Sequence, residues 1–151
     1  MDKIHFSSVS AEWETPEDLF EELDKEFHFD LDPAATEENA KCVVFFTKEL
    51  DGLSLPWEGF TVFCNPPYGR ELPKWVKKAS ESKTTTVLLM PARTDTSYFH
   101  DYVLGKAEVR FLRGRLHFVN RALPSYRSDG GFVKSRAPFP SMIVIFRNEG
   151  I

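Results

Sequence analysis

Apolar and acidic residues alternate at helical spacing near the start of the chain. Four apolar residues recur three or four positions apart, with acidic residues among them: Leu19, Phe20, Leu23 and Phe27. This pattern is typical of an amphipathic helix with one buried face. Thr15 is of the type that caps helices, and Pro16 suits the first helical position. The pattern therefore predicts a helix that Thr15 caps and that ends near Phe27–His28.

Short apolar runs rich in β-branched and aromatic residues follow. We interpret six of them as strands: residues 29–33, 60–64, 84–90, 108–111, 116–119 and 141–146. A seventh apolar run, residues 42–46, is either a strand or another buried segment. Helical patterns separate several of these runs: residues 37–41, 73–80 and 96–104. Strands that alternate with helices predict an α/β fold with a mainly parallel sheet. No helical pattern separates the last two strands, so we expect them to form an antiparallel pair at one edge.

Polar and proline-rich segments directly follow two of the predicted strands. Asp32-Pro33-Ala34 ends the first strand, and Asn65-Pro66-Pro67-Tyr68 follows residues 60–64. In parallel sheets, ligands bind beyond the carboxyl ends of the strands. Both segments are therefore candidate binding sites at the same edge of the sheet.

The segment Asn65-Pro66-Pro67-Tyr68 predicts a stiff loop with two outward acceptors. Proline lacks an N–H group and has a fixed φ, and a residue before proline is extended. The side-chain oxygen of Asn65 and the carbonyl of Pro66 can therefore accept both N–H bonds of one planar amino group. Such contacts orient the nitrogen lone pair for attack, and the Tyr68 ring could stack on a planar substrate. The alternative is a proline turn that only ends the strand.

Length and composition limit the class of protein further. The 151 residues suit one domain, and 42% hydrophobic with 28% charged residues is globular composition. No apolar run reaches the roughly 18–20 residues of a membrane span, and the polar N-terminus does not resemble a signal peptide. Two cysteines cannot make a disulfide framework, and the four histidines lack metal-ligand spacing. We expect an intracellular protein without a metal site.

Charge is distributed unevenly along the chain. Residues 1–69 carry a net charge of −12 and residues 70–151 a net charge of +8. Arginine dominates the basic half, and its guanidinium group suits bidentate contacts to phosphate. The basic half is therefore either a nucleic-acid-binding surface or a solvated face balanced by the acidic half.

Together these segments resemble the phage-type DNA N6-adenine methyltransferase (Dam) family. Asn65–Tyr68 after a strand resembles the catalytic motif of amino methyltransferases that use S-adenosylmethionine. Other stretches resemble the family in the same order along nearly the whole chain: Trp13–Pro16, Phe29–Ala35, Glu38–Cys42, Phe45–Thr47, Cys64–Arg70, Pro91–Thr96, Arg110–Leu116 and Ala137–Ser141. The usual glycine-rich first loop of methyltransferases is absent, and Asp32–Ala35 stands in its place, as in the phage family.

The resemblance implies a Rossmann-like class I methyltransferase fold over residues 1–151, with S-adenosylmethionine as methyl donor. The implied acceptor is an adenine of double-stranded DNA, flipped out because its N6 amino group is otherwise paired and stacked. Asn65 and Pro66 would accept hydrogen bonds from this amino group, Tyr68 would stack on the base, and Pro67 would stiffen the loop. A phage or prophage gene acting in the bacterial cytoplasm is also implied.

The candidate cofactor-binding residues are Trp13, Thr15, Asp30, Asp32, Pro33, Ala34 and Asp51. Thr15 resembles the hydrogen-bond donor that other amino methyltransferases place near the methionine end of the cofactor. It is also a candidate helix cap, and both roles could hold at once. Asp32 would contact the ribose hydroxyls or the methionine ammonium, and Asp30 shares its side of the strand; alternatively one of the two caps a helix or pairs with an arginine. Asp51 would contact the adenine of the cofactor, or it belongs to an Asp-Gly turn.

The candidate DNA-contacting residues lie in the basic half: Arg93, Arg113, Arg115, Arg121, Arg127, Lys134 and Arg136. Arg93 either faces the mouth of the site or pairs with Asp95. Arg113 and Arg115 flank Gly114 and would share a face in a strand. Residues 120–138 are the predicted loop long enough to read bases or contact phosphates. A chain this small either recognises a short sequence or forms a homodimer to gain contacts.

Two alternative functions remain open at this point. The same fold and motif can hold the amine of an RNA base or the side-chain amide of a protein glutamine. A non-catalytic DNA-binding module with the same fold is the alternative from another class. The basic half favours a nucleic acid over a protein acceptor, and the intact Asn65–Tyr68 segment favours an enzyme.

Overall fold

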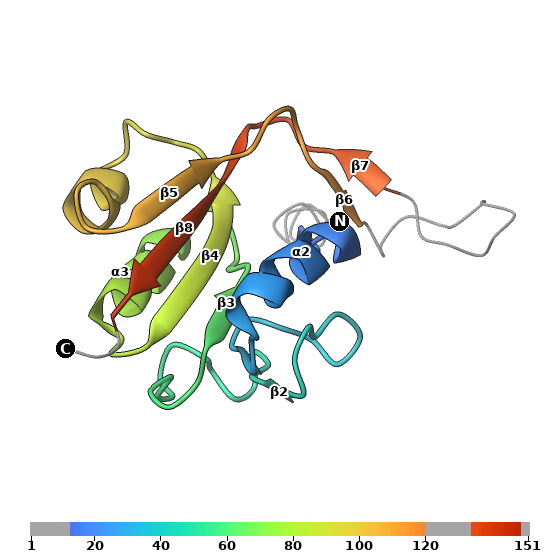
Figure 1. Ribbon diagram of the computed structural model, residues 1–151, viewed down its shortest axis with the longest axis vertical. Helices are drawn as coiled ribbons and strands as arrows, with labels where there is room; N and C mark the ends of the chain where they lie inside the picture. Colours follow the sequence, from blue (N-terminus) through green and yellow to red (C-terminus); the bar gives the residue numbers. More distant parts are fainter. Residues whose placement is uncertain (1–12, 120–133, 149–151) are drawn as a thin grey trace, which may run out of the picture.

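A six-stranded sheet forms the centre of the computed structural model, which describes residues 13–119 and 134–148 (Figure 1). The strands follow the order β2 (Val44–Phe45), β1 (Leu31–Asp32), β3 (Val62–Cys64), β4 (Thr85–Pro91), β8 (Ser141–Arg147) and β5 (Glu108–Phe111). A separate two-stranded ribbon pairs β6 (His117–Val119) with β7 (Lys134–Arg136). The predicted α/β class is confirmed.

The parallel part of the sheet contains a topological switch point. Strands β2, β1, β3 and β4 run parallel, and the chain leaves β1 toward β2 before it returns past β1 to form β3. In such sheets the crevice beyond the carboxyl ends of the two strands at the switch point binds ligands. Asp32 ends β1 and Asn65 follows β3, so the two segments singled out in the sequence lie at this crevice.

The antiparallel edge pair is confirmed, but its strands differ from those expected. Strand β8 runs antiparallel between β4 and β5, so the edge pair is β5 with β8. The predicted strand 116–119 forms the ribbon with β7 instead, and β7 lies within residues that the sequence assigned to a loop. Six of the seven residues of β8 are buried, which explains why β8 takes an inner position flanked by strands on both sides.

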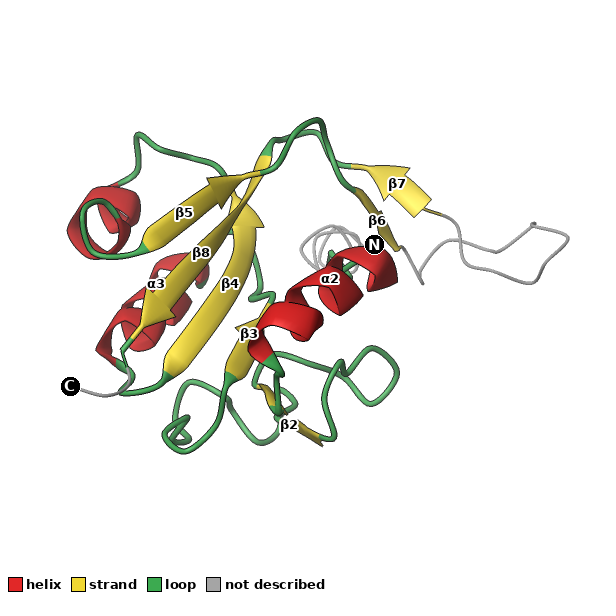
Figure 2. Ribbon diagram, in the orientation of Figure 1, coloured by secondary structure: helices red, strands yellow, loops and turns green. Residues whose placement is uncertain are grey.

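Helices cover both faces of the sheet and define two cores. Helix α2 (Glu17–Phe27) lies on one face, whereas α3 (Leu72–Glu81) and the short π-helix η1 (Phe99–Val103) lie on the other (Figure 2). Strand β4 contributes to both cores because its side chains alternate. Val87 and Leu89 pack with the α2 cluster, and Leu88 and Met90 pack with the α3 cluster. All seven β4 residues are buried, as predicted for a strand covered on both faces.

Helix α2 ends where predicted but begins with a different cap. Its last residue is Phe27, and the left-handed His28 (φ 57°) closes it with a backbone bond to Asp24. Pro16 occupies the cap position and no side chain caps the helix, so the prediction that Thr15 caps α2 is wrong. Proline at this position leaves the Thr15 hydroxyl available for another contact, described below.

Residues 37–41 form a turn rather than the predicted short helix. The backbone N–H of Thr36 donates to the side-chain oxygen of Asn39, and the backbone N–H of Asn39 donates to the hydroxyl of Thr36. The backbone N–H of Lys41 donates to the carboxylate of Asp32. These contacts compete with helical bonds for the same backbone groups. The segment instead closes a loop beside β1.

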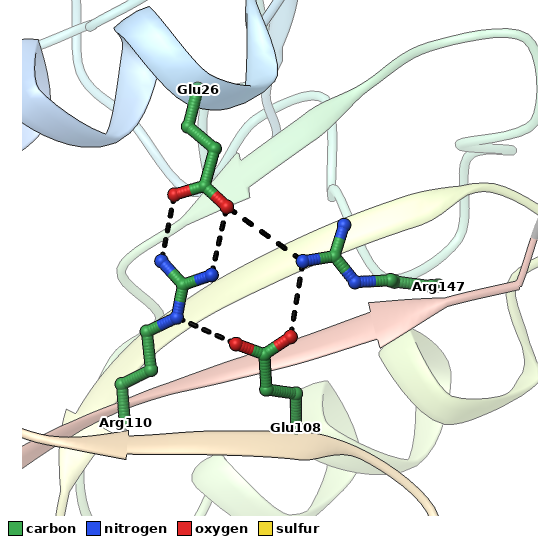
Figure 3. Close-up of polar contacts among 4 residues, drawn as sticks. All are labelled: Glu26, Glu108, Arg110 and Arg147. Carbon is green, nitrogen blue, oxygen red and sulfur yellow. Dashed lines mark hydrogen bonds and ion pairs between the residues drawn. The ribbon is translucent and has the colours of Figure 1, made fainter.

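An ion-pair network ties α2 to the antiparallel edge pair (Figure 3). Arg110 donates two bonds to Glu26, at 2.7 and 2.8 Å, and one to Glu108, at 2.7 Å. Arg147 bonds Glu108 at 3.0 Å and lies 3.7 Å from Glu26. Hydrogen bonds from Arg110 lower the pKa of both glutamates. Both arginines are therefore paired with carboxylates.

Within the described residues, no helix combines the length and apolar character that crossing a bilayer requires.

Candidate active site

A cavity of about 670 Å³ opens at the carboxyl ends of β1 and β3. The residues predicted from the sequence that line it are Trp13, Thr15, Asp32, Pro33, Ala34, Asp51, Asn65, Pro66 and Pro67. They come from the segment before α2, from the loop after β1, from the loop after β2 and from the loop after β3. The structure thus brings most of the predicted cofactor-binding residues and most of the predicted catalytic segment to one cavity.

Asp32 lies at the inner wall of this cavity and is 4% exposed. Its carboxylate accepts hydrogen bonds from the backbone N–H groups of Lys41 at 3.0 Å and of Ala34 at 3.4 Å. Burial raises the pKa of Asp32 to about 6, against the opposing effect of these two bonds. Asp32 therefore holds the loop after β1 in place and also presents a carboxyl group to the cavity.

The loop that carries Asp51 also lines the cavity. Asp51 adopts a left-handed conformation (φ 59°) in a turn closed by bonds from Ser54 to its carbonyl. A β-carbon on the next residue, Gly52, would lie 2.1 Å from the carbonyl oxygen of Pro33. Only glycine permits this close approach, so Gly52 lets the loops after β1 and β2 pack together around the cavity.

Asp30 is not part of this cavity lining. It is exposed, and its carboxylate accepts a 2.6 Å bond from the backbone N–H of Thr61. Asp32, two residues on, is buried. The two acids therefore occupy different surroundings, and Asp30 links the start of β1 to the segment before β3.

The side-chain amide of Asn65 is held at both ends. Its nitrogen donates to the backbone carbonyl of Trp13 and, at 3.0 Å, to the hydroxyl of Thr15. Its oxygen accepts a 2.7 Å bond from the hydroxyl of Tyr68. This is the contact that the Thr15 hydroxyl makes in place of a helix cap.

Tyr68 is partly buried and is not among the residues that line the cavity. Its ring meets Phe139 edge to face, with centroids 5.7 Å apart and planes at 81°. Besides Asn65, its hydroxyl lies 3.3 Å from the carbonyl oxygen of Leu89. Burial raises the pKa of Tyr68 far above its usual range, so the hydroxyl keeps its proton and acts as a hydrogen-bond donor.

The segment with Trp13 and Thr15 is attached to the ribbon. Glu14 forms an isolated antiparallel bridge with Val119 of β6, and the Val119 N–H donates to the Glu14 carbonyl at 3.1 Å. The Trp13 ring lies edge-on to Phe118 and Phe139, with both centroids 5.4 Å away. Strand β6 therefore holds the residues that contact Asn65.

The described basic candidates are exposed around this site. Arg93 follows β4 and lies over the ring of Phe139 at 5.9 Å; among the described residues it makes no ion pair with Asp95. Arg113 and Arg115 lie in the bend between β5 and β6, with Gly114 in a left-handed conformation (φ 73°), so they belong to neither strand.

Lys134 and Arg136 both point to solvent from β7, since they alternate with half-buried Ser135. Arg136 pairs with His117 and Lys134 with Val119 across the ribbon. One face of the ribbon is therefore basic. Arg121, Arg127 and most of the segment 120–138 lie outside the described residues.

Several lining residues were not singled out in the sequence. Phe46 and Thr47 directly follow β2, and Val119 ends β6. The rule that indicated Asp32, a position beyond the carboxyl end of a parallel strand, also applies to Phe46 and Thr47. Val119 carries no such signal because a residue of the ribbon reaches the cavity only through tertiary packing.

A protein family and two phage proteins of similar sequence share one description. The family described as DNA N-6-adenine-methyltransferase (Dam) matches residues 5–149. The DNA N-6-adenine-methyltransferase of Haemophilus phage HP1 (strain HP1c1) is 30% identical over 139 residues, which cover 89% of this chain and 77% of the phage protein. That of Escherichia phage T1 is 33% identical over 109 residues, or 69% of this chain and 45% of the phage protein. With a match over nearly its whole length and a methyltransferase-like α/β sheet, the chain belongs to the DNA N-6-adenine-methyltransferase (Dam) family.

Proposed function

We propose that this protein transfers a methyl group from S-adenosylmethionine to the N6 amino group of a flipped adenine in double-stranded DNA. The host would be a bacterium that carries the phage or prophage gene, and the reaction would take place in its cytoplasm. The observation that carries the proposal is that Asn65 and Pro66 line the cavity at the switch point. The methyl group of a cofactor in that cavity would then lie beside an amino group held by Asn65.

The acceptor atoms at this place suit an amino group. An amide oxygen accepts two hydrogen bonds, and Tyr68 occupies one position on Asn65. The second position and the carbonyl of Pro66 are the two acceptors that an adenine amino group requires. Accepting both N–H bonds concentrates the lone pair on N6, and the alkylated nitrogen then loses its proton readily. A neutral asparagine is therefore sufficient, and no strong base is needed.

The cavity fits the proposed cofactor in size and lining. A volume of about 670 Å³ lies within the usual range for small-molecule sites. The buried carboxyl group of Asp32 would bind ribose hydroxyls or the methionine ammonium, and Asp51 would contact the adenine of the cofactor. Phe46, Leu53 and Trp75 supply apolar surface. When bound, S-adenosylmethionine supplies an electrophilic methyl group on a sulfonium.

Access to the adenine N6 atom requires the base to leave the duplex. In the proposed complex one face of the Tyr68 ring stacks on the base while the ring keeps its contact with Phe139. Pro67 stiffens the loop between the acceptors and this ring. The stacking energy offsets part of the unstacking cost, which is a few kcal/mol.

The DNA-binding surface in this proposal is the basic face of the ribbon together with the adjoining bend. Arg113, Arg115, Lys134 and Arg136 are exposed there, and the two-stranded ribbon has dimensions that the major groove admits. Arg93 lies nearer the site, and Arg121 and Arg127 belong to the connection between the two ribbon strands. These cations would contact phosphates or bases.

The test is methyl transfer from labelled S-adenosylmethionine to unmethylated duplex DNA of mixed sequence, followed by mass spectrometry of the nucleosides. We expect N6-methyladenine in the DNA. Parallel reactions with RNA and with a glutamine-containing peptide examine the alternative acceptors. Label in RNA or peptide but not in DNA would contradict the proposed acceptor, and cofactor binding without transfer to any of the three would favour the non-catalytic DNA-binding module.

A further inference from the structure

We propose that Thr15 and the hydroxyl of Tyr68 are positioning residues, which hold the Asn65 amide in the one orientation that presents its oxygen to the substrate amine. This inference rests on the proposed role of Asn65. It assigns Thr15 a role toward Asn65 rather than toward the cofactor. It also separates the work of the Tyr68 hydroxyl from that of the Tyr68 ring.

The orientation of the amide follows from the chemistry of its three partners. The Trp13 carbonyl can only accept a hydrogen bond, so it must face the amide nitrogen. The protonated Tyr68 hydroxyl donates to the amide oxygen. A 180° flip would place oxygen against the Trp13 carbonyl and the amino group against the Tyr68 donor. The Trp13 contact would be lost, because a carbonyl cannot donate, and the Tyr68 hydroxyl would have to accept from the amide and turn its proton to the carbonyl of Leu89, 3.3 Å away. The Trp13 carbonyl therefore selects this orientation, and the bond from Tyr68 to the amide oxygen reinforces it.

The Thr15 hydroxyl adapts to this orientation and reinforces it. A hydroxyl can accept as well as donate, and here it accepts the second amide N–H at 3.0 Å. Thr15 is 3% exposed, so water does not replace this bond easily. Its hydroxyl makes no cap to α2, which leaves Asn65 as the contact that explains a buried threonine here.

The remaining hydrogen-bonding position of the amide is one lone pair on its oxygen. Both N–H groups and the other lone pair are used by Thr15, Trp13 and Tyr68. Positioning that is already present before the substrate arrives lowers the barrier, because no reorganisation is required during the reaction. Loss of either contact would let the amide rotate away from the productive geometry.

The test compares single-turnover methyl-transfer rates of Thr15→Val, Thr15→Ser and Tyr68→Phe with the wild type. We expect Thr15→Val and Tyr68→Phe to lose roughly tenfold or more in rate, since a small misplacement of a catalytic group can cost up to ~100-fold. Thr15→Ser keeps the hydroxyl and should restore most of the rate. Calorimetric titration should show that all three variants bind S-adenosylmethionine as the wild type does.

Two matched controls remove the same groups elsewhere. Thr86→Val deletes a buried β4 hydroxyl that has no hydrogen-bond partner among the described residues, and Tyr102→Phe deletes a hydroxyl on η1, on the α3 side of the sheet. Both should keep the wild-type rate. Thermal melting of every variant identifies any that fails to fold. If Thr15→Val fails to fold, the rates of Tyr68→Phe and Thr15→Ser still test whether these hydroxyls position Asn65.

A double-mutant cycle separates positioning from direct contact with the cofactor. Once Asn65 is alanine there is no amide to position, so Thr15→Val should cause little further loss in the Asn65→Ala protein. An additive loss, or weaker cofactor binding by Thr15→Val, would overturn the inference for Thr15. A wild-type rate in Tyr68→Phe would overturn it for Tyr68. Absence of adenine methylation by the wild type, by contrast, would reject the proposed function itself.

Discussion

At the scale of single residues, the polar side chains of Asn65 and Asp32 at the cavity are both held by hydrogen bonds to specific partners. The Asn65 amide is bonded at both ends, and Asp32 accepts two backbone N–H groups while buried at 4% exposure. Buried polar groups cost free energy unless they are paired. The two side chains central to the proposed chemistry are therefore also residues on which the local structure depends.

Replacing Asn65 with alanine should lower the methyl-transfer rate by on the order of 10²-fold or more, as removal of other preorganised polar groups does. Cofactor binding should be largely kept. The change also leaves the Trp13 carbonyl and the Thr15 and Tyr68 hydroxyls without this partner, so we expect a loss of roughly 1–3 kcal/mol in stability. Single-turnover kinetics and urea unfolding measure the two effects, and near-normal turnover would rule out the proposed mechanism.

The raised pKa of Asp32, about 6 in the folded protein against a usual 3.8, makes stability depend on pH. The folded protein keeps this proton to a higher pH than the unfolded chain does. The free energy of unfolding should therefore fall as the pH rises through this window. The stability of the wild type relative to Asp32→Asn should decrease by roughly 2 kcal/mol between pH 4 and pH 7. Urea unfolding of both proteins across this range tests the prediction, and a constant difference would contradict it.

At the scale of elements, the ribbon of β6 and β7 joins two parts of the proposed reaction. Strand β7 carries the exposed Lys134 and Arg136, while Val119 of β6, the cross-strand partner of Lys134, bridges Glu14 and lines the cavity. The edge pair β5 and β8 has a different role. Its arginines, Arg110 and Arg147, are paired with glutamates and so contribute to the attachment of α2 rather than to a basic surface.

Removing the charge of Lys134 or Arg136 should weaken DNA binding and make the binding constant depend less steeply on salt concentration. Each phosphate contact contributes about 0.9 to the slope of log K against log salt concentration. We therefore expect Lys134→Ala and Arg136→Ala each to reduce that slope by about one. Fluorescence anisotropy with a labelled duplex at several salt concentrations measures it.

Lys106→Ala is the matched control for this prediction. Lys106 is exposed but lies just before β5, at the amino end of that strand, and its ammonium bonds the carbonyl of Asp101. Its removal should leave the slope unchanged. An equal effect of all three substitutions would indicate a non-specific charge effect rather than a contact by the ribbon.

At the scale of the whole molecule, the cavity is assembled from distant segments. Residues from before α2, from the loops after β1, β2 and β3, and from the end of β6 all line it. A ligand in such a cavity touches several elements at once. It therefore stabilises the fold as a unit by the free energy of its binding.

S-adenosylmethionine at 100 times its Kd should stabilise the protein by about 2.7 kcal/mol, which raises Tm by roughly 5–10 °C for a chain of this size. Differential scanning calorimetry measures the shift, with ATP as a nucleotide that lacks the methionine group. Asn65→Ala should keep the shift, and Asp32→Asn should lose much of it. Equal shifts with ATP and S-adenosylmethionine would contradict a cofactor site of the proposed kind.

The sequence by itself determined the α/β class, the end of α2, most strand positions and the two segments at the switch point. These features follow from local patterns in the sequence: the spacing of apolar residues, the positions of prolines, and the rule that ligands bind beyond the carboxyl ends of parallel strands. Only the tertiary structure decided the contact of Thr15 with Asn65, the pairing of β8 with β5 and the position of Val119 in the lining of the cavity. Each of these joins residues far apart in the chain, and their partners depend on competition among burial, capping and pairing that no local pattern expresses.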